Sequence, residues 1–103
     1  MVKHVHEHFY MHFVYILSNA RRTVYYTGST SDLRKRVYFH KQGLIPGFTR
    51  KYNLDELVYY EVAKDIHSAR GREKQIKSYR RAKKLALIRL MNPQSVDLAQ
   101  QIL

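Results

Sequence analysis

The sequence predicts an α+β protein with a three-stranded antiparallel sheet flanked by helices. Three stretches rich in β-branched and aromatic residues predict the strands, namely residues 9–17, 24–27 and 57–62. The first two are separated only by the polar turn at residues 18–23, so we expect them to form a hairpin. Helical patterns follow the second strand and fill residues 65–91 after the third.

The length of 103 residues predicts a single domain with one core. We expect this domain to cover residues 10–103, with residues 1–9 as a histidine-rich leader. The leader and the strand after it carry histidines at even-numbered positions: His4, His6, His8 and His12. An extended strand would place these rings on one face, where they could bind a transition metal, but we favour an irregular terminal segment that faces solvent.

The charge of the chain is strongly positive, with 19 Lys and Arg against 8 Asp and Glu and a net charge of +11. Such a charge on a small surface attracts polyanions, so we expect a nucleic-acid partner and no membrane association, although the charge alone does not distinguish DNA from RNA. Without cysteine, the sequence has no disulfide framework and no thiolate chemistry. We expect a cytoplasmic protein, and the oligomeric state stays open between a monomer and a weak dimer.

The first strand is apolar in both of its phases, which is typical of a strand at the centre of a sheet. It contributes Tyr15, and the second strand contributes Tyr25 or Tyr26. We expect Gly28 to end the second strand, just before the next helix begins.

The helix that follows is expected to be capped by Ser29, Thr30 or Ser31, with Asp32 in its first turn. Leu33 and Val37 would share its buried stripe. Asp32, Arg36 and His40 follow one another at intervals of four on another stripe, so Arg36 and His40 point the same way.

Residues 43–53 contain two glycines and a proline, so we expect no regular element there. This segment mixes aromatic and basic side chains: Phe48, Arg50, Lys51 and Tyr52. The mixture suits unstacked bases and phosphates, but a loop pinned to the core by Phe48 explains it equally well.

The helical region over residues 65–91 is expected to break near residues 79–83, and residues 96–103 predict a short terminal helix. Glu73 lies in an otherwise apolar stripe of this region. Its spacing favours an ion pair with Lys77 over a role in metal or proton chemistry. The basic run at residues 80–84 is interpreted as a solvated face that adds to the positive field.

Several short motifs resemble the GIY-YIG endonuclease domain family over nearly the whole chain. Residues 13–15, Phe-Val-Tyr, stand at the first motif, and residues 26–28, Tyr-Thr-Gly, stand at the second. Arg36, His40, Glu73 and Asn92 match the family's later positions. The chain is most similar to the small stand-alone bacterial members, and it resembles the nuclease domain of the excision-repair incision subunit.

The resemblance implies a DNA endonuclease, with a function in DNA repair among the expectations. It implies the catalytic residues Tyr15, Tyr26, Arg36, His40 and Glu73, with Glu73 as the ligand of Mg²⁺ or Mn²⁺. Tyr26 is the expected general base, with His40 as its proton relay and Tyr15 as a positioning group. Because Phe13 replaces the first-motif glycine, catalysis depends on whether DNA requires a small residue at that position.

The residue composition limits the metal chemistry. With 8 scattered acidic residues, a carboxylate-rich two-metal cage is hard to build, whereas a single Mg²⁺ commonly uses only one or two protein carboxylates. The residues expected to contact DNA are Arg34, Lys35, Lys41, Arg50, Lys51, Lys77 and Asn92. The alternative function is a non-catalytic nucleic-acid-binding module that retains the nuclease fold.

Overall fold

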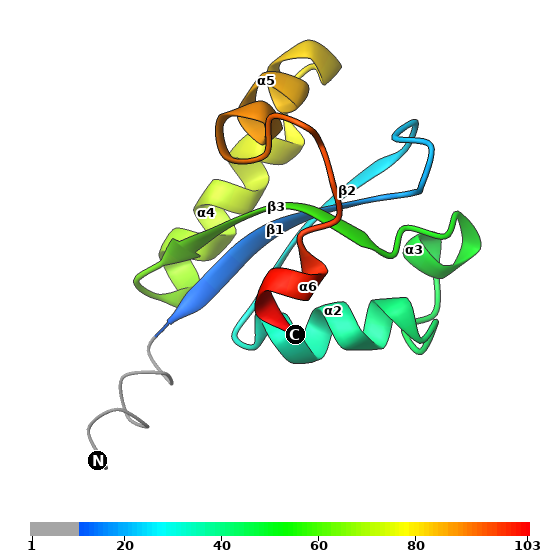
Figure 1. The fold of residues 1–103 in the computed structure, drawn as a ribbon. Helices are drawn as coiled ribbons and strands as arrows, with labels where there is room; N and C mark the ends of the chain where they lie inside the picture. The colour runs from blue at the N-terminus through cyan, green and yellow to red at the C-terminus, as the bar shows by residue number, and fades with distance from the viewer. Residues whose placement is uncertain (1–10) are drawn as a thin grey trace.

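The computed structural model describes residues 11–103, so the expected leader over residues 1–9, with His4, His6 and His8, lies outside the described part. The predicted fold class is confirmed, because three antiparallel strands form one sheet between helices (Figure 1). In chain order the elements are β1 (His12–Ser18), β2 (Tyr25–Thr30), α2 (Leu33–Lys41), α3 (Phe48–Lys51), β3 (Glu56–Ala63), α4 (Ile66–Lys77), α5 (Arg81–Met91) and α6 (Ala99–Ile102).

Strand β1 lies at the centre of the sheet, whose order is β2-β1-β3. Residues Val14 to Ser18 are all buried, which is the burial that the apolar character of both phases predicted. In the hairpin, Tyr15 pairs with Gly28 and Leu17 with Tyr26. Among residues 11–103, β2 is therefore an edge strand, and its outer side is not covered by another strand.

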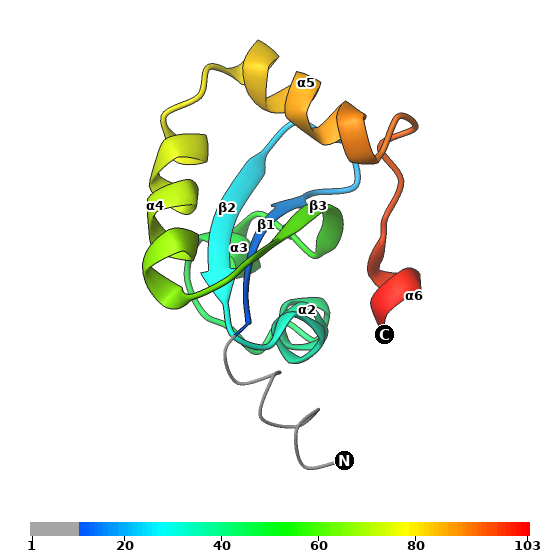
Figure 2. The same ribbon diagram turned by 90° about the vertical axis from the view of Figure 1, so that its left-hand side faces the viewer.

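Helices cover both faces of the sheet. Helix α2 and the short α6 pack on one face, where Tyr15, Leu17 and Val37 belong to one apolar cluster. Helices α4 and α5 arch over the other face, as Figure 2 shows, and there Ile16, Ile76 and a second set of side chains form the other cluster. The outer edge of β2 lies between these two layers.

The expected end of β2 at Gly28 is wrong. The strand continues to Thr30, and Gly28 pairs with Tyr15 within the ladder. A glycine inside a strand commonly marks a place where another group approaches the backbone closely. At Gly28 that group is the Tyr15 ring, as the site geometry below describes.

The expected cap of the next helix is also wrong. Asp32 is the N-cap of α2, and its carboxylate accepts a hydrogen bond of 3.1 Å from the backbone N–H of Lys35. Because β2 runs on to Thr30, the two hydroxyl residues Ser29 and Thr30 belong to the strand. The predicted stripes of α2 are observed, with Leu33 and Val37 buried against the sheet.

The segment over residues 43–53 contains the short helix α3, which the sequence prediction missed. Phe48 does not pin this segment to the core, because it is 51% exposed and stacks on Tyr52 with ring centroids 4.8 Å apart. Thr49 and Leu54 are the buried anchors instead. Of the two interpretations of this segment, the one in which Phe48 pins it to the core is therefore wrong.

The predicted break in the long helical region is confirmed, since residues 78–80 separate α4 from α5. Helix α5 ends at Asn92, whose side chain is buried and holds the chain that follows. Its Nδ2 donates to the carbonyls of Val58 at 3.1 Å and Val96 at 2.7 Å, and its Oδ1 accepts from the Val96 N–H. These contacts fasten the C-terminal segment to β3.

Replacing Asn92 with alanine is expected to lower the free energy of unfolding by about 2–4 kcal/mol, because buried backbone groups lose their partners. Urea titrations of the purified variants measure this change. Exposed Gln94 provides the control, and we expect Gln94→Ala to stay within about 0.5 kcal/mol of the wild type. Equal stability of the two variants would contradict the structural role of Asn92.

Among residues 11–103, no helix has the length and apolar character needed to cross a membrane.

Candidate active site

Three aromatic rings meet on the face of the sheet that α2 covers. Tyr15 comes from β1, Tyr26 from β2 and His40 from α2. The ring centroids lie 6.3 Å apart for the two tyrosines, 6.2 Å for Tyr15 and His40, and 6.3 Å for Tyr26 and His40. Each pair is tilted, which is a favourable geometry for aromatic contacts. The structure thus brings together three of the expected catalytic residues.

Gly28 lets the Tyr15 side chain cross strand β2. A Cβ atom at position 28 would lie 2.7 Å from the Tyr15 hydroxyl oxygen and 2.9 Å from Cε2 of Tyr26, which is closer than real Cβ atoms approach. Because Tyr15 and Gly28 are cross-strand partners, the ring of Tyr15 lies directly over the glycine. The Tyr15 hydroxyl consequently reaches toward the outer edge of the sheet.

Arg36 approaches these rings from helix α2, one turn before His40. Burial raises the pKa of Tyr15, and the positive charge of Arg36 works against this increase. Burial lowers the pKa of His40, and the charge of Arg36 lowers it further. Arg36 is partly buried and also lines an open cavity of about 500 Å³ together with Lys35 and Thr30. A guanidinium with this placement can meet an anion that enters from the side of β2.

Glu73 reaches the same edge from helix α4. The hydroxyl of Ser29 in β2 donates to its Oε1 at 2.6 Å, and Lys77 pairs with its Oε2 at 2.7 Å. Burial raises the pKa of Glu73, but the hydrogen bonds from Lys77 and Ser29 outweigh it and bring the pKa below its ordinary value. The predicted ion pair with Lys77 is therefore present, and the carboxylate is ionised at neutral pH.

These contacts locate the candidate site at the outer edge of β2. Tyr15, Tyr26, Arg36 and His40 approach the edge from the α2 side, and Glu73 approaches it from the α4 side. The negative charge of Glu73 contributes to the raised pKa of Tyr15, as expected if the phenol and the carboxylate lie near each other. An edge strand leaves this side of the sheet accessible to a ligand.

The protonation states of Tyr15 and His40 follow from the burial of their side chains. Burial is the main cause that raises the pKa of Tyr15 well above its ordinary value, so the phenol stays protonated and acts as a hydrogen-bond donor. Burial, with the charge of Arg36, lowers the pKa of His40 from 6.5 to about 4. The imidazole is therefore neutral at pH 7, and its buried Nε2 has no hydrogen-bond partner in the described part of the chain.

The lowered pKa of His40 predicts a pH-dependent loss of stability. The unfolded chain binds a proton at His40 below pH 6.5, whereas the folded chain binds it only near pH 4, so stability falls as the pH falls through this window. Between pH 7 and pH 4, we expect the free energy of unfolding of the wild type to fall by up to about 3 kcal/mol more than that of His40→Gln. Urea unfolding at a series of pH values measures it, and parallel curves for the two proteins would contradict the prediction.

The donor chemistry of the site fits a single hard cation. Glu73 offers carboxylate oxygens, and Mg²⁺ commonly takes one or two protein carboxylates and completes its shell with water and phosphate oxygens. The side chain of Lys77 is 50% exposed, so it can swing away from the carboxylate when a cation competes. Within residues 11–103, no group of three or more His, Cys, Asp or Glu side chains comes together, which makes a multi-carboxylate cage a poor fit.

The residues expected to contact DNA are distributed unevenly. Arg34, Lys35, Arg50 and Lys51 are exposed, and Lys77 stands beside Glu73, with its Nζ 6.0 Å from the centroid of the Tyr26 ring.

Two other members of that set have structural partners instead. Lys41 pairs with Asp97 at 2.6 Å and donates to the backbone carbonyl of Asp55. Asn92 is buried at 3% exposure and uses its amide within the fold. These contacts hold Lys41 beside the partly exposed Asp97 and keep the Asn92 amide within the fold.

Phe13, which replaces the first-motif glycine, is partly buried and packs against the α2-side core. It lines a cavity of about 540 Å³ with Met11, Leu33, Arg34 and Tyr60, among others. None of the five expected catalytic residues lines that cavity. The larger side chain is therefore accommodated within the α2-side core, against the same cluster as Tyr15 and Tyr26.

Ser29 is the member of the site that sequence reasoning missed. Its hydroxyl was interpreted as a helix cap, but it lies in β2 and holds Glu73. The alternation of the strand offered a signal, because Ser29 falls two residues after Thr27 and four after Tyr25, on the face that α4 covers. That signal required knowing that the strand runs past Gly28.

Comparisons with known proteins identify the family. The family model described as the GIY-YIG catalytic domain matches residues 11–86. A UPF0213 protein of Natronomonas pharaonis is 42% identical over 77 residues, which cover 75% of this chain and 89% of that protein. A UPF0213 protein of Clostridium perfringens is 38% identical over 78 residues, covering 76% and 83%.

A solved structure is also similar. The solution NMR structure of a UPF0213 protein from Bacillus halodurans superimposes with a TM-score of 0.55 and 27% sequence identity, covering 89% of this chain and 97% of that one. The family match covers most of the chain, including Tyr15, Tyr26, Arg36, His40 and Glu73. The chain therefore belongs to the GIY-YIG catalytic domain family.

Proposed function

We propose that this protein is an endonuclease that hydrolyses phosphodiester bonds, with DNA as its substrate ahead of RNA and one Mg²⁺ or Mn²⁺ at Glu73. The observation that carries the proposal is the convergence of two phenols, a guanidinium, an imidazole and a carboxylate at the outer edge of β2. Phosphodiester hydrolysis needs a positioned phosphate, stabilisation of its developing charge and a route for the proton of water. This set of side chains can supply all three.

Arg36 is the proposed phosphate clamp. Its planar donors match two phosphate oxygens at once, which a lysine cannot do. Being partly buried, the guanidinium acts in a less polar environment than an exposed one, so its effect on developing negative charge is larger.

Tyr26 is the proposed acceptor of the proton from water. As its oxygen takes the proton of water, Tyr26 gives up its own phenolic proton to His40, which lies beside it as a neutral imidazole whose Nε2 has no partner among the described residues. Tyr15 keeps its own proton and donates a hydrogen bond that orients the water or the phosphate.

Glu73 is the proposed metal-holding residue, and Ser29 keeps its carboxylate at the edge of the strand. When bound, the cation would supply Lewis acidity and stabilise charge on the phosphoryl group. Lys77 neutralises the carboxylate when no cation is present.

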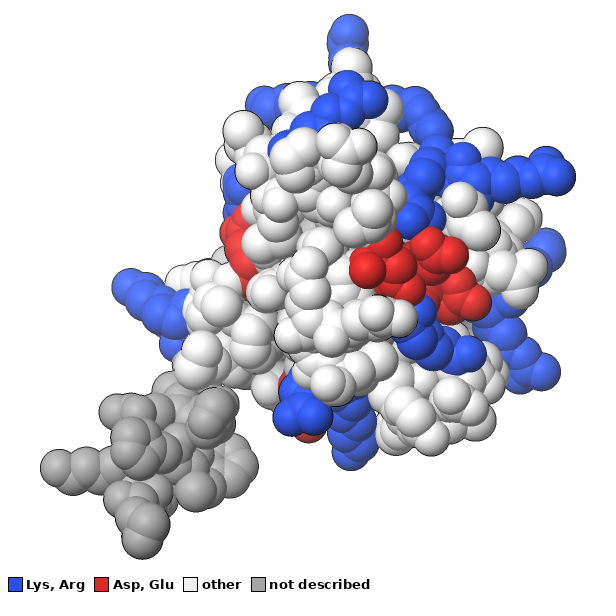
Figure 3. Space-filling model, in the orientation of Figure 1, with Lys and Arg blue, Asp and Glu red and all other residues white. Residues whose placement is uncertain are grey.

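The distribution of charge supports a polyanionic substrate. Figure 3 shows a cluster of acidic side chains near the centre of the face drawn, with further acidic atoms at its left edge. Glu56 and Asp97, at the β3 side of the molecule, pair there with Arg22 and Lys41. Near β2, Glu73 pairs with Lys77, and Asp32 lines the cavity that Lys35 and Arg36 share, so among these residues the cations outnumber the acids.

A nicking assay with supercoiled plasmid and branched DNA tests the proposal. The wild type is compared with Glu73→Gln in Mg²⁺, in Mn²⁺ and in EDTA, with Glu61→Gln as a control on the β3 side. We expect metal-dependent nicking by the wild type and by Glu61→Gln, and loss of nicking with Glu73→Gln. Equal background nicking by all three proteins, with or without metal, would refute the enzyme and favour the non-catalytic binding module.

A further inference from the structure

A second cationic cavity lies where helix α4 passes into α5. It has a volume of about 240 Å³ and is lined by Tyr25, Tyr79, Arg81 and Lys84. Two of these four described residues are cations and the other two are phenols, so no acid among them neutralises the cavity. Tyr25 belongs to β2, the strand that also carries Tyr26 and Ser29 of the candidate active site.

Arg81 is fixed in this cavity by contacts from the β1–β2 turn. Its Nη1 donates to the carbonyl of Thr23 and its Nη2 to the carbonyl of Arg22, both at 3.1 Å. The guanidinium carbon lies 5.3 Å from the centroid of the Tyr25 ring, which is cation–π geometry. Arginine has five N–H donors, so two bonds to carbonyls leave others for a ligand.

Lys84 is the half-buried cation of the cavity, and it extends the positive charge of the candidate active site. Burial lowers its pKa, and the charge of Lys77 lowers it further, so the ammonium group of Lys84 stands near that of Lys77. Lys77 in turn pairs with Glu73. The cations Lys77 and Lys84 thus follow one another from the Glu73 carboxylate toward the cavity.

We propose that this cavity is a second phosphate subsite, in which Lys84 and Arg81 hold another backbone phosphate of the same nucleic-acid strand. The inference rests on the proposed function for its ligand, and it adds the position where the strand continues beyond Arg36. A phosphate bound here would offset the charge of Lys84, which the nearby charge of Lys77 otherwise disfavours. The phenols of Tyr25 and Tyr79 provide an apolar wall with polar tips around it.

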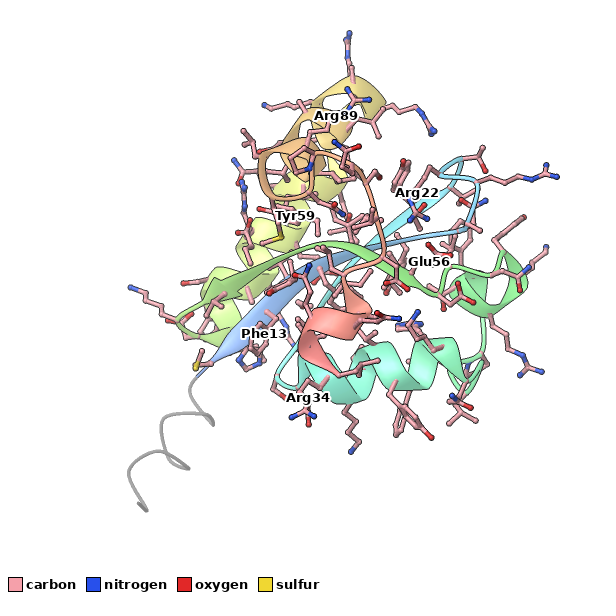
Figure 4. The ribbon with its side chains drawn as sticks, in the orientation of Figure 1. Phe13, Arg22, Arg34, Glu56, Tyr59 and Arg89 are labelled. Atoms are coloured by element: carbon pink, nitrogen blue, oxygen red, sulfur yellow. The ribbon has the colours of Figure 1, made fainter. Side chains whose placement is uncertain are left out.

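The basic run that contains Arg81 and Lys84 was interpreted from the sequence as a solvated face. The structure separates its members, because Lys84 and Arg81 line the cavity, whereas Arg80 does not. Figure 4 shows Arg89 of the same helix extending away from the fold. Only part of the positive charge of α5 therefore belongs to the subsite.

Lys84→Gln tests the subsite, with Lys64→Gln as the matched control. Both changes remove one positive charge, but Lys64 is exposed and lies before α4, at the other end of that helix. Binding to matched DNA and RNA duplexes is measured by fluorescence anisotropy in EDTA at several salt concentrations. We expect Lys84→Gln to lose about 5- to 10-fold in affinity and to reduce the salt slope by about 0.9, and Lys64→Gln to lose less than about twofold.

Inorganic phosphate provides a direct probe of the cavity. Titrating it into ¹⁵N-labelled wild type is expected to shift the resonances of Tyr25, Arg81 and Lys84, and Lys84→Gln is expected to abolish these shifts. The same spectra report whether the variant is folded. Equal shifts in Lys84→Gln, or equal loss of affinity in the two variants, would overturn the subsite.

These outcomes are independent of cleavage. A wild type that binds as expected but does not nick DNA would refute the proposed nuclease and retain the subsite. A wild type that nicks DNA while Lys84→Gln behaves like Lys64→Gln would refute the subsite alone. Stronger effects of Lys84→Gln on the DNA duplex than on RNA would assign the phosphate to DNA, and the reverse would assign it to RNA.

Discussion

Arg36→Ala is expected to lower the rate of DNA cleavage about 100- to 1000-fold, because a charge-stabilising donor at the phosphate is lost. Arg36→Lys is expected to recover only a small part of the rate, since a lysine keeps the charge without the two-point contact. Single-turnover nicking with Mg²⁺ measures both rates. Affinity for DNA should change far less than the rate, because the contact acts mainly as charge develops.

Arg34→Ala is the matched control for this experiment. Arg34 lies on the same helix and carries the same charge, but Figure 4 shows its side chain extending from α2 at the surface of the fold. We expect its cleavage rate to stay within about threefold of the wild type, as for removal of one exposed phosphate contact. A loss of rate as large as that of Arg36→Ala would reduce the role of Arg36 to general electrostatics.

Gly28→Ala is expected to damage both stability and cleavage. The added methyl group would lie 2.7 Å from Cζ and from the hydroxyl of Tyr15, so the ring must move away from the edge of β2. Overpacking of this kind costs about 1–3 kcal/mol of stability. The displaced phenol no longer reaches the site, so we expect cleavage to fall by more than the loss of folded protein explains.

Gly71→Ala separates the effect of position from the effect of the substitution. Gly71 lies within α4, and a Cβ there would have no atom within 4 Å. Alanine is the better helix former by about 1 kcal/mol, so this variant should be slightly more stable than the wild type. Thermal melts and nicking rates compare the two, and a harmless Gly28→Ala would contradict the close approach of Tyr15.

The elements were predictable from local pattern, with errors at their ends. The two apolar phases of β1 indicated a central strand, and the slip of the apolar phase indicated the break between α4 and α5. The errors at Gly28 and Asp32 have one cause. A glycine was interpreted as a strand end from its own flexibility, whereas the ring of Tyr15 across the ladder is what requires it.

The candidate site was predictable only in part. The intervals within α2 placed Arg36 and His40 on one stripe, and the family motifs supplied the two tyrosines and Glu73. The spacing within α4 also indicated the ion pair of Glu73 with Lys77, which the structure contains. The contact of Ser29 with Glu73 joins residues 44 positions apart, and no local pattern contains such a distance.

By itself, the sequence determined the class of fold, the excess of positive charge and the identity of the groups available for phosphate chemistry. Those properties are set by residue type and by spacing within a single element. Tertiary structure decided which of these side chains stay available to a ligand, because packing turned Lys41 toward Asp97 and buried Asn92, while it set Arg81 and Lys84 around one cavity. The physical reason is that the direction of a side chain depends on the neighbours that the whole fold supplies, and these neighbours come from distant parts of the chain.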